Sequence, residues 1–386
     1  MMKKVKKLLK TSKRIFKSCS LKNGAIVASD VTSEDYPRDV KNYFYVWPRD
    51  ASFVCVACDL LGLKKIPQKF FEWCWERAEL FKETGVFLSQ KFYPHGRMAG
   101  DYDVPLKTQD LKRKKIKEFA SWQTNVRLYY THFQPDQVGS LLWAIHHHSK
   151  FSDVGEFKEM IIKAADGICN YWKKDHFKIP SFDLWEEKVA LPSLKQIHVY
   201  SVAQCIKGLE CACELVKPKK RWLICIKQMK ILIEKSYDRK LGYFIKTYGK
   251  KIDKTLDSSS LGLVWPSGVI EANDERMLST VNKIIKLNSK KGGIMRYKGD
   301  EYDGKISSLQ LSLKGAGAWP ILNFWLSIYF SLLGEKRKAK KYFNWVLERV
   351  EDKIPEQIKR NKPASIIPLA WSHAMFVIAG KILKIL

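Results

Sequence analysis

Residues 318–350 read AWPILNFWLSIYFSLLGEKRKAKKYFNWVLERV, and their pattern is the starting point for predicting the fold. Apolar side chains recur with helical periodicity over 318–333 and again over 335–350. Only Gly334 and Glu335 mark the boundary between the two runs. A link this short implies that the two helices are antiparallel neighbours. The stretch therefore predicts a helical hairpin.

The same pattern extends over the whole chain, where short turns alternate with long, polar, aromatic-rich connections. No Gly/Ser or Pro repeat divides the chain, so we expect one all-α domain over residues 1–386. Six hairpins that close on themselves would form an (α/α)6 toroid of about twelve antiparallel helices, with the long loops at one end. Periodicity alone does not distinguish this toroid from an open solenoid. The predicted helices are 3–20, 50–62, 66–82, 134–150, 153–174, 199–215, 218–236, 255–264, 273–288, 318–333, 335–350 and 369–385.

The composition excludes several classes of protein. With 69 Lys+Arg against 40 Asp+Glu the net charge is +29, yet 46% of residues are apolar and 12% aromatic, which excludes a disordered chain. No run of about 18 uncharged apolar residues is present, so no transmembrane segment is expected. The charge by itself points to a nucleic acid or a membrane. No nucleic-acid-binding motif accompanies it, so no nucleic-acid partner is expected.

Residues 1–20 predict a basic amphipathic first helix, with eight Lys or Arg and no acid among residues 1–17. Two alternatives are a membrane-surface helix and a helix that packs on the domain with a solvated lysine face; the second is favoured. A signal peptide would need a continuous apolar stretch, which is absent here. We therefore expect a cytoplasmic protein whose nine cysteines are reduced thiols. The oligomeric state stays open.

One cysteine pattern and one histidine pattern resemble metal-binding motifs, but their spacing argues against a metal site. Cys55 and Cys58 lie in an apolar helical run without a matching second ligand pair, which favours core packing. His146, His147 and His148 are consecutive on a helix, where neighbours point about 100° apart and do not face one metal. No metal site and no cofactor is expected.

Four groups of loop residues each combine an aromatic side chain with a carboxylate or an arginine. Aromatic faces stack on the C–H faces of sugar rings, and charged groups form hydrogen bonds with sugar hydroxyls. Together the segments predict carbohydrate binding at one end of the helices. They are 43–50, 181–187, 292–302 with Trp319-Pro320, and 354–357 with 368–373.

In order and spacing these motifs resemble the glucoamylase family, glycoside hydrolase family 15, in its catalytic domain, from about residue 18 to the end. The resemblance implies an (α/α)6 barrel with a pocket at one end, in agreement with the helix count. The matching motifs are Tyr43 to Asp50 (aromatic-x-Tyr-x-Trp-x-Arg-Asp), Leu184 to Glu187 (Leu-Trp-Glu-Glu), Arg296-Tyr297, Glu356-Gln357 and Trp371-Ser372.

The resemblance implies that Glu186 is the general acid and Glu356 the general base of an inverting glycosidase. An inverting pair leaves room for a water molecule, with the carboxyl groups on the order of 6.5–9.5 Å apart. We expect the adjacent Glu187, as a like charge, and desolvation by Trp185 to raise the pKa of Glu186.

The resemblance further implies the residues that bind substrate. For Arg49 and Asp50 the alternative is an internal ion pair that caps the second helix. For Trp371 to His373, helix capping and end packing are alternatives to substrate contact. Trp122 is a looser candidate for a stacking residue. The expected substrate-binding residues are Tyr43, Trp47, Arg49, Asp50, Trp185, Glu187, Arg296 and Trp319.

The chain also departs from the family pattern. Only about forty residues precede the first motif, so no N-terminal β-sandwich domain is expected. Residues 188–196 form an apparent insertion near the leaving-group side, and the basic stretch 111–117 is either a solvated rim or a contact surface.

The resemblance thus implies an inverting exo-acting α-glucosidase that releases β-glucose from the non-reducing ends of α-glucans or maltooligosaccharides, and these sugars are its expected partners. An α,α-trehalase, an α-1,6-glucan hydrolase and a non-catalytic glycan-binding protein are the alternatives.

Overall fold

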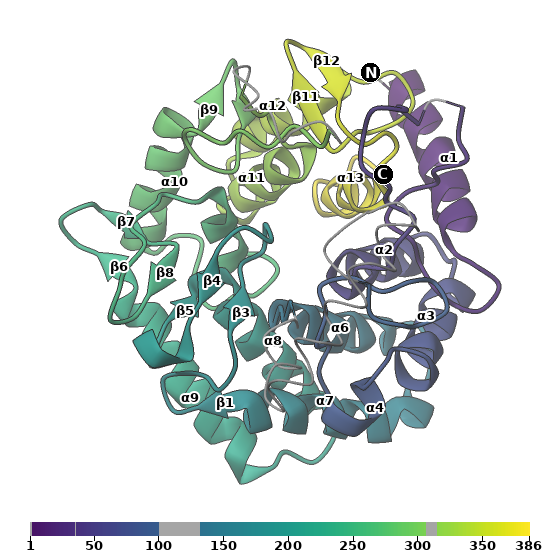
Figure 1. Cartoon of the computed structure of the whole chain (residues 1–386). Helices are drawn as coiled ribbons and strands as arrows, with labels where there is room; N and C mark the ends of the chain where they lie inside the picture. The colour runs from purple at the N-terminus through teal and green to yellow at the C-terminus, as the bar shows by residue number, and fades with distance from the viewer. Residues whose placement is uncertain (1, 35, 100–131, 306–314) are drawn as a thin grey trace, which may run out of the picture.

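The computed structural model describes residues 2–34, 36–99, 132–305 and 315–386. Its helices form two layers of a closed ring (Figure 1). Each element of the inner layer contacts the next, and α13 contacts α2 to close the ring. The inner elements are α2 (Pro48–Leu60), α6 (Asp136–His148), α8 (Val199–Leu215), the 3-10 helix η4 (Ser258–Leu263), α11 (Pro320–Leu332) and α13 (Ala370–Ile382).

The outer layer alternates with the inner one along the chain, so each outer helix runs back along the ring before the next inner element begins. In the described part of the chain, six outer and six inner elements alternate in this way, which confirms the (α/α)6 toroid. A short helix, α4 (Phe81–Thr84), is additional to the two layers. The outer helices are α1 (Met2–Cys19), α3 (Lys65–Glu76), α7 (Lys158–Tyr171), α9 (Lys220–Lys235), α10 (Glu275–Leu287) and α12 (Lys336–Leu347).

The composition of each layer explains its position. The inner helix α11 is buried continuously from Pro320 to Phe330, because it is apolar on all sides. The outer helix α1 is amphipathic. It buries Leu8, Ile15 and Phe16 against α13 and α2 and exposes its lysine face. The packing interpretation of residues 1–20 is therefore confirmed.

Three predicted helices differ from the structure in helix type or by more than three residues at one end. Residues 255–264 form a 3-10 helix over Ser258–Leu263, because three consecutive serines compete for backbone hydrogen bonds and Pro266 offers no N–H to continue a helix. The helix predicted over 66–82 ends at Glu76, and the Glu79 N–H bonds the Gly96 carbonyl instead (2.9 Å). The helix predicted over 153–174 begins as the 3-10 helix η2 (Gly155–Phe157) and ends at Tyr171.

The loops contain short antiparallel strand pairs of two or three residues. The strands β3 and β4 flank the loop that carries Glu186. Glu356 directly precedes β11 of the β11–β12 pair. Residues 188–196, the apparent insertion, form β4 and the 3-10 helix η3 (Pro192–Leu194). The pairs are β1 (Trp172–Lys173) with β2 (His176–Phe177), β3 (Ser181–Phe182) with β4 (Val189–Ala190), β5 (Ile197–His198) with β8 (Thr247–Tyr248), β6 (Tyr237–Asp238) with β7 (Tyr243–Phe244), β9 (Ser289–Lys290) with β10 (Gly293–Ile294), and β11 (Gln357–Lys359) with β12 (Lys362–Ala364).

All nine cysteines are free thiols, and Cys55 and Cys58 are buried in α2, where they pack in the core as expected. Among the described residues, no helix combines the length and the apolar character needed to cross a membrane. Trp122 and the basic stretch 111–117 lie outside the described residues.

Candidate active site

A cavity of about 1120 Å³ lies at the end of the ring where the inner helices begin. Several of its lining residues stand at the first turn of an inner helix, such as Arg49 and Asp50 on α2 and Trp371 on α13. The volume is of the size that accommodates a small oligosaccharide. The cavity brings together every site residue predicted from the sequence, namely Tyr43, Trp47, Arg49, Asp50, Trp185, Glu186, Glu187, Arg296, Trp319 and Glu356.

Glu186 lies in a tight turn in the loop between β3 and β4. Its backbone is left-handed (φ 65°), a strained conformation for a residue other than glycine. Its N–H bonds the Asp183 carbonyl (3.1 Å), and the Trp47 indole Nε1 donates to its Oε1 (2.6 Å). The carboxyl group is therefore held both from its backbone and from across the cavity.

Burial raises the pKa of Glu186 to about 7, although the Arg49 and Lys91 cations and the Trp47 hydrogen bond oppose the shift. The nearby carboxylate that adds to the increase is Asp50. The expectation that the adjacent Glu187 takes this role is corrected, since the Glu187 side chain turns toward Arg296 instead. The carboxyl group of Glu186 thus retains a proton up to near-neutral pH.

Glu356 is buried in the loop between α12 and β11, with 2% of its surface exposed. The Tyr43 hydroxyl donates to its Oε1 (2.8 Å), and the Ser365 hydroxyl donates to its Oε2. Burial raises the pKa of Glu356, and these two hydrogen bonds counteract the increase. The Tyr43 oxygen also bonds the Tyr302 hydroxyl (2.6 Å).

Gly304 provides the space that this arrangement needs. A Cβ at this position would lie 1.9 Å from Ser365 Oγ and 3.2 Å from Glu356 Oε2, and its φ of 74° is in the left-handed region. Only glycine therefore fits beside the Glu356 carboxylate.

The segment 43–47 connects the two carboxylates. Tyr43 bonds Glu356, Trp47 bonds Glu186, and the Tyr43 and Trp47 rings lie 5.0 Å apart. Two aromatic side chains in contact thus each hold one carboxyl group, which places both groups on the same cavity.

Arg49 is part of a buried ion cluster at the start of α2. It lies 3.1 Å from Asp50 Oδ1 and 3.2 Å from Asp136 Oδ2, and its guanidinium stacks over the Trp371 ring at 5.3 Å. The internal ion pair that was the alternative for Arg49 and Asp50 is therefore present, and both residues also line the cavity.

Arg296 forms a second charged cluster in the cavity wall. It bonds Asp300 Oδ2 through Nε (2.7 Å) and Glu187 Oε1 through Nη2 (2.6 Å), and the Tyr297 hydroxyl donates to Glu187 Oε2 (2.5 Å). The rings of Trp185, Tyr302 and Trp319 lie 4.9–5.4 Å from its guanidinium carbon. This wall combines aromatic faces with hydrogen-bonding groups, as a sugar-binding surface requires.

Some residues of the site were not singled out from the sequence. Lys91 stacks over Tyr45 and Trp47 (4.7 and 5.8 Å), and it adds a cation to the cavity lining, as Arg49 and Arg296 do. Tyr302 lies in the segment 292–302, which was identified from the sequence. Ser365 and Asp136 belong to no motif, and only the fold brings them to Glu356 and Arg49.

His147 and His148 both contact the buried Asp59 (3.3 and 2.7 Å). In the described ranges, no three His, Cys, Asp or Glu side chains form a group that could hold a metal ion.

The model of "Glycosyl hydrolases family 15" matches residues 4–381. An uncharacterized glycosyl hydrolase of Methanocaldococcus jannaschii is 31% identical over 92% of this chain and 52% of its own length. A trehalase of Thermoplasma volcanium is 24% identical over 80% of this chain and 46% of its own length. The chain thus spans about half the length of these two relatives.

A bacterial glucoamylase solved in complex with acarbose has a similar fold, with a TM-score of 0.68 at 20% identity over 97% of this chain and 55% of that one. The family match covers nearly all of the chain, including the loops that line the cavity. The protein described here therefore belongs to glycosyl hydrolase family 15.

Proposed function

We propose that the protein is an inverting, exo-acting α-glucosidase that releases β-glucose from the non-reducing ends of α-glucans or maltooligosaccharides. In this proposal Glu186 is the general acid and Glu356 is the general base. The observation that carries the proposal is the pair of buried carboxyl groups on one cavity in different surroundings. Glu186 has a pKa raised to about 7, and Glu356 accepts two hydroxyl hydrogen bonds that favour its ionised form.

The proposed reaction uses both carboxyl groups. Glu186 transfers its proton to the glycosidic oxygen as the bond from that oxygen to the anomeric carbon breaks. A water molecule attacks the anomeric carbon from the opposite face, and Glu356 accepts the proton that this water loses. The Tyr43 hydroxyl keeps the Glu356 carboxylate in place. One new C–O bond replaces the broken one with inverted configuration, so an α-linkage yields β-glucose.

The substrate linkage distinguishes this proposal from its closest alternatives. An α,α-trehalase would use the same two carboxyl groups, and one relative is a trehalase. An α-1,6-glucan hydrolase would differ in how the sugar beyond the scissile bond is held, and the family resemblance implies that Glu187 binds this sugar. A non-catalytic glycan-binding protein would not need a carboxyl group whose pKa is raised to about 7, as that of Glu186 is.

The test is a panel of maltose, maltotriose, isomaltose, trehalose and glycogen, with glucose release and its anomer followed by proton NMR. We expect glucose from maltose and maltotriose, with the β-anomer appearing first and mutarotation following. Cleavage of trehalose alone would instead identify a trehalase, and cleavage of isomaltose alone an α-1,6-glucan hydrolase. Saturable binding without product would contradict an enzyme.

The pH dependence of kcat/KM provides a second prediction. Glu186 must be protonated, so activity should fall as the pH rises through about 7. Glu356 must be ionised, so activity should fall as the pH drops through its pKa, which lies above that of an ordinary glutamate. The Ser365 hydroxyl lowers that pKa, so Ser365→Ala should move the acidic limb to higher pH. The alkaline limb should stay in place, and a shift of that limb instead would contradict the two assignments.

A further inference from the structure

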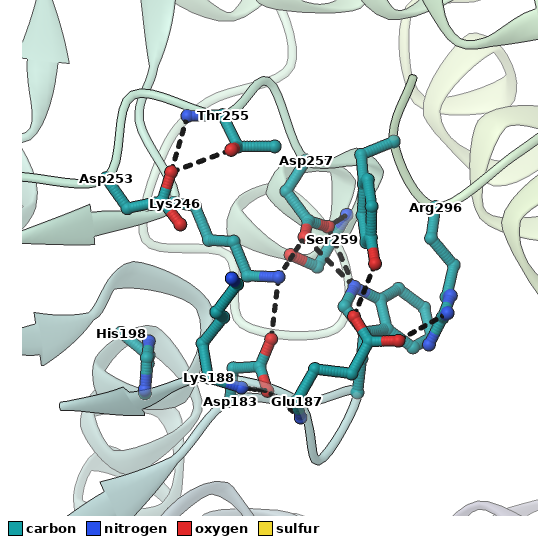
Figure 2. A network of polar contacts seen from close by, with 12 residues as sticks. Asp183, Glu187, Lys188, His198, Lys246, Asp253, Thr255, Asp257, Ser259 and Arg296 are labelled. Carbon is teal, nitrogen blue, oxygen red and sulfur yellow. Dashed lines mark hydrogen bonds and ion pairs between the residues drawn. The ribbon is translucent and has the colours of Figure 1, made fainter. Parts of the chain in front are cut away.

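Asp183, in the loop between β3 and β4, belongs to a buried ion cluster with Lys246 and Asp257 (Figure 2). Lys246 Nζ lies 2.7 Å from Asp183 Oδ2 and 3.1 Å from Asp257 Oδ2. At most 5% of each of the three side chains is exposed. One ammonium group thus pairs with two carboxylates away from solvent, and nothing in the reaction above uses it.

Asp183 holds the turn that contains Glu186. Its Oδ1 accepts the N–H groups of Glu187 (2.8 Å) and Lys188 (3.0 Å), and its backbone carbonyl accepts the N–H of Glu186 (3.1 Å). Burial acts to raise the pKa of Asp183, but the Lys246 ammonium outweighs it with the help of His198 and the backbone bond, so the pKa lies below its ordinary value. The ionised carboxylate can therefore accept both backbone bonds, which support the left-handed conformation of Glu186.

Asp257 holds the residue on the other side of Glu186. Both of its carboxylate oxygens accept the Trp185 indole Nε1–H (2.9 and 3.0 Å), and Oδ1 also accepts the Ser259 N–H at the start of η4 (2.8 Å). The Trp185 ring packs against Trp319 with 5.3 Å between centroids. The position of Trp185 in the cavity wall thus depends on Asp257.

Lys246 also contacts Tyr297, which bonds Glu187, the residue that follows the acid. Its Nζ lies 4.9 Å from the centre of the Tyr297 ring, and the Tyr297 hydroxyl bonds Glu187. The Lys246 side chain therefore contacts three residues that form hydrogen bonds with the loop of the acid. These are Asp183, which bonds residues 186, 187 and 188, Asp257, which bonds Trp185, and Tyr297, which bonds Glu187.

We infer that Lys246 is a positioning residue for Glu186: its ammonium group binds together the two carboxylates that hold the acid loop. The inference rests on the proposed role of Glu186 as the general acid. Without the ammonium group, two carboxylates would be buried close together with no cation between them, which strongly favours protonation or rearrangement of one of them. A protonated or displaced Asp183 would release the turn, and the proton of Glu186 would no longer point at the glycosidic oxygen.

The test compares two substrates that differ in their need for an acid. One is the disaccharide that the protein cleaves best, whose leaving oxygen needs a proton. The other is α-glucosyl fluoride, whose leaving group departs as fluoride with little need of one. Lys246→Met should lower kcat/KM on the disaccharide at least about tenfold more than on the fluoride, in the direction of the loss from a missing general acid. Because a partly unfolded sample lowers both rates equally, the ratio of the two rates reports the position of the acid and not the amount of folded protein.

Two further variants complete the experiment. Lys246→Gln retains a hydrogen-bond donor without the charge and should shift the ratio in the same direction, which provides a second measurement should the methionine variant not fold. Lys254→Met is the matched control, because Lys254 lies eight residues further along and pairs with Asp238 (2.9 Å) at the surface, with 57% of its side chain exposed. This variant should leave both rates unchanged.

An unchanged substrate ratio in both Lys246 variants would overturn the inference. Failure of the underlying function has a different signature. In that case the unmodified protein cleaves neither substrate, or Glu186→Gln loses both activities to the same extent.

Discussion

Glu186→Gln is expected to lower kcat on the best disaccharide substrate by at least about 10²-fold, the lower end of what a general acid contributes. The glutamine has the same shape as glutamate, and its Oε1 can still accept the Trp47 Nε1 hydrogen bond that Glu186 accepts at 2.6 Å. The site should therefore keep its geometry and lose only the transferable proton. Steady-state release of glucose measures the effect.

A substrate that needs no acid separates this loss from a structural defect. On α-glucosyl fluoride the variant should keep most of its activity, since fluoride leaves with little need of a proton. Glu335→Gln is the matched control, because Glu335 is a partly exposed residue of the outer layer that pairs with Lys338 (2.6 Å). Near-normal turnover of the disaccharide by the Glu186 variant would remove Glu186 from the role of acid.

Glu356→Gln is expected to lower kcat by at least about 10²-fold on both substrates. Water must be deprotonated whichever leaving group departs, and an amide does not accept that proton. The glutamine side chain still fills the space between Tyr43 and Ser365, and the Tyr43 hydroxyl can donate to Tyr302 where it no longer finds a carboxylate. The variant should therefore fold and bind substrate.

An added nucleophile tests the second assignment directly. Azide needs no general base, so excess azide should restore turnover of α-glucosyl fluoride by Glu356→Gln and yield β-glucosyl azide. An α-configured azide would contradict inversion. The two roles would be exchanged if Glu356→Gln kept its hydrolysis of the fluoride while Glu186→Gln lost activity on both substrates.

Most of the fold could be predicted from the sequence because helix periodicity and helix ends are local signals. The hairpin over 318–350 contains both its periodic apolar residues and its Gly334 turn within one short stretch. The predictions failed where another segment, or the local residue types, compete for the backbone hydrogen bonds of a helix. Glu79 leaves its helix to bond Gly96, and the serine run before Pro266 forms a 3-10 helix that closes the inner ring between α8 and α11.

The ten residues singled out from the sequence stand in short motifs of aromatic and charged side chains that match the family pattern, and all ten line the cavity. The groups that surround them could not be predicted in the same way. Sequence proximity suggested Glu187 as the carboxylate that raises the pKa of Glu186, but Asp50 has this position, and Glu187 pairs with Arg296. Adjacent residues in a turn point in different directions, so nearness along the chain does not predict nearness of charges.

The sequence by itself determined the helical hairpins and the loop-borne carboxylates and aromatic residues, and its resemblance to the family implied the toroid. Only the tertiary structure decided which groups surround each carboxylate. Ser365 and Tyr43 bond Glu356, Trp47 bonds Glu186, and Lys246 joins Asp183 to Asp257. The physical reason is that helix formation depends on neighbours within a few residues. Burial and electrostatic interaction depend on distances in space, and these are set by closing the ring.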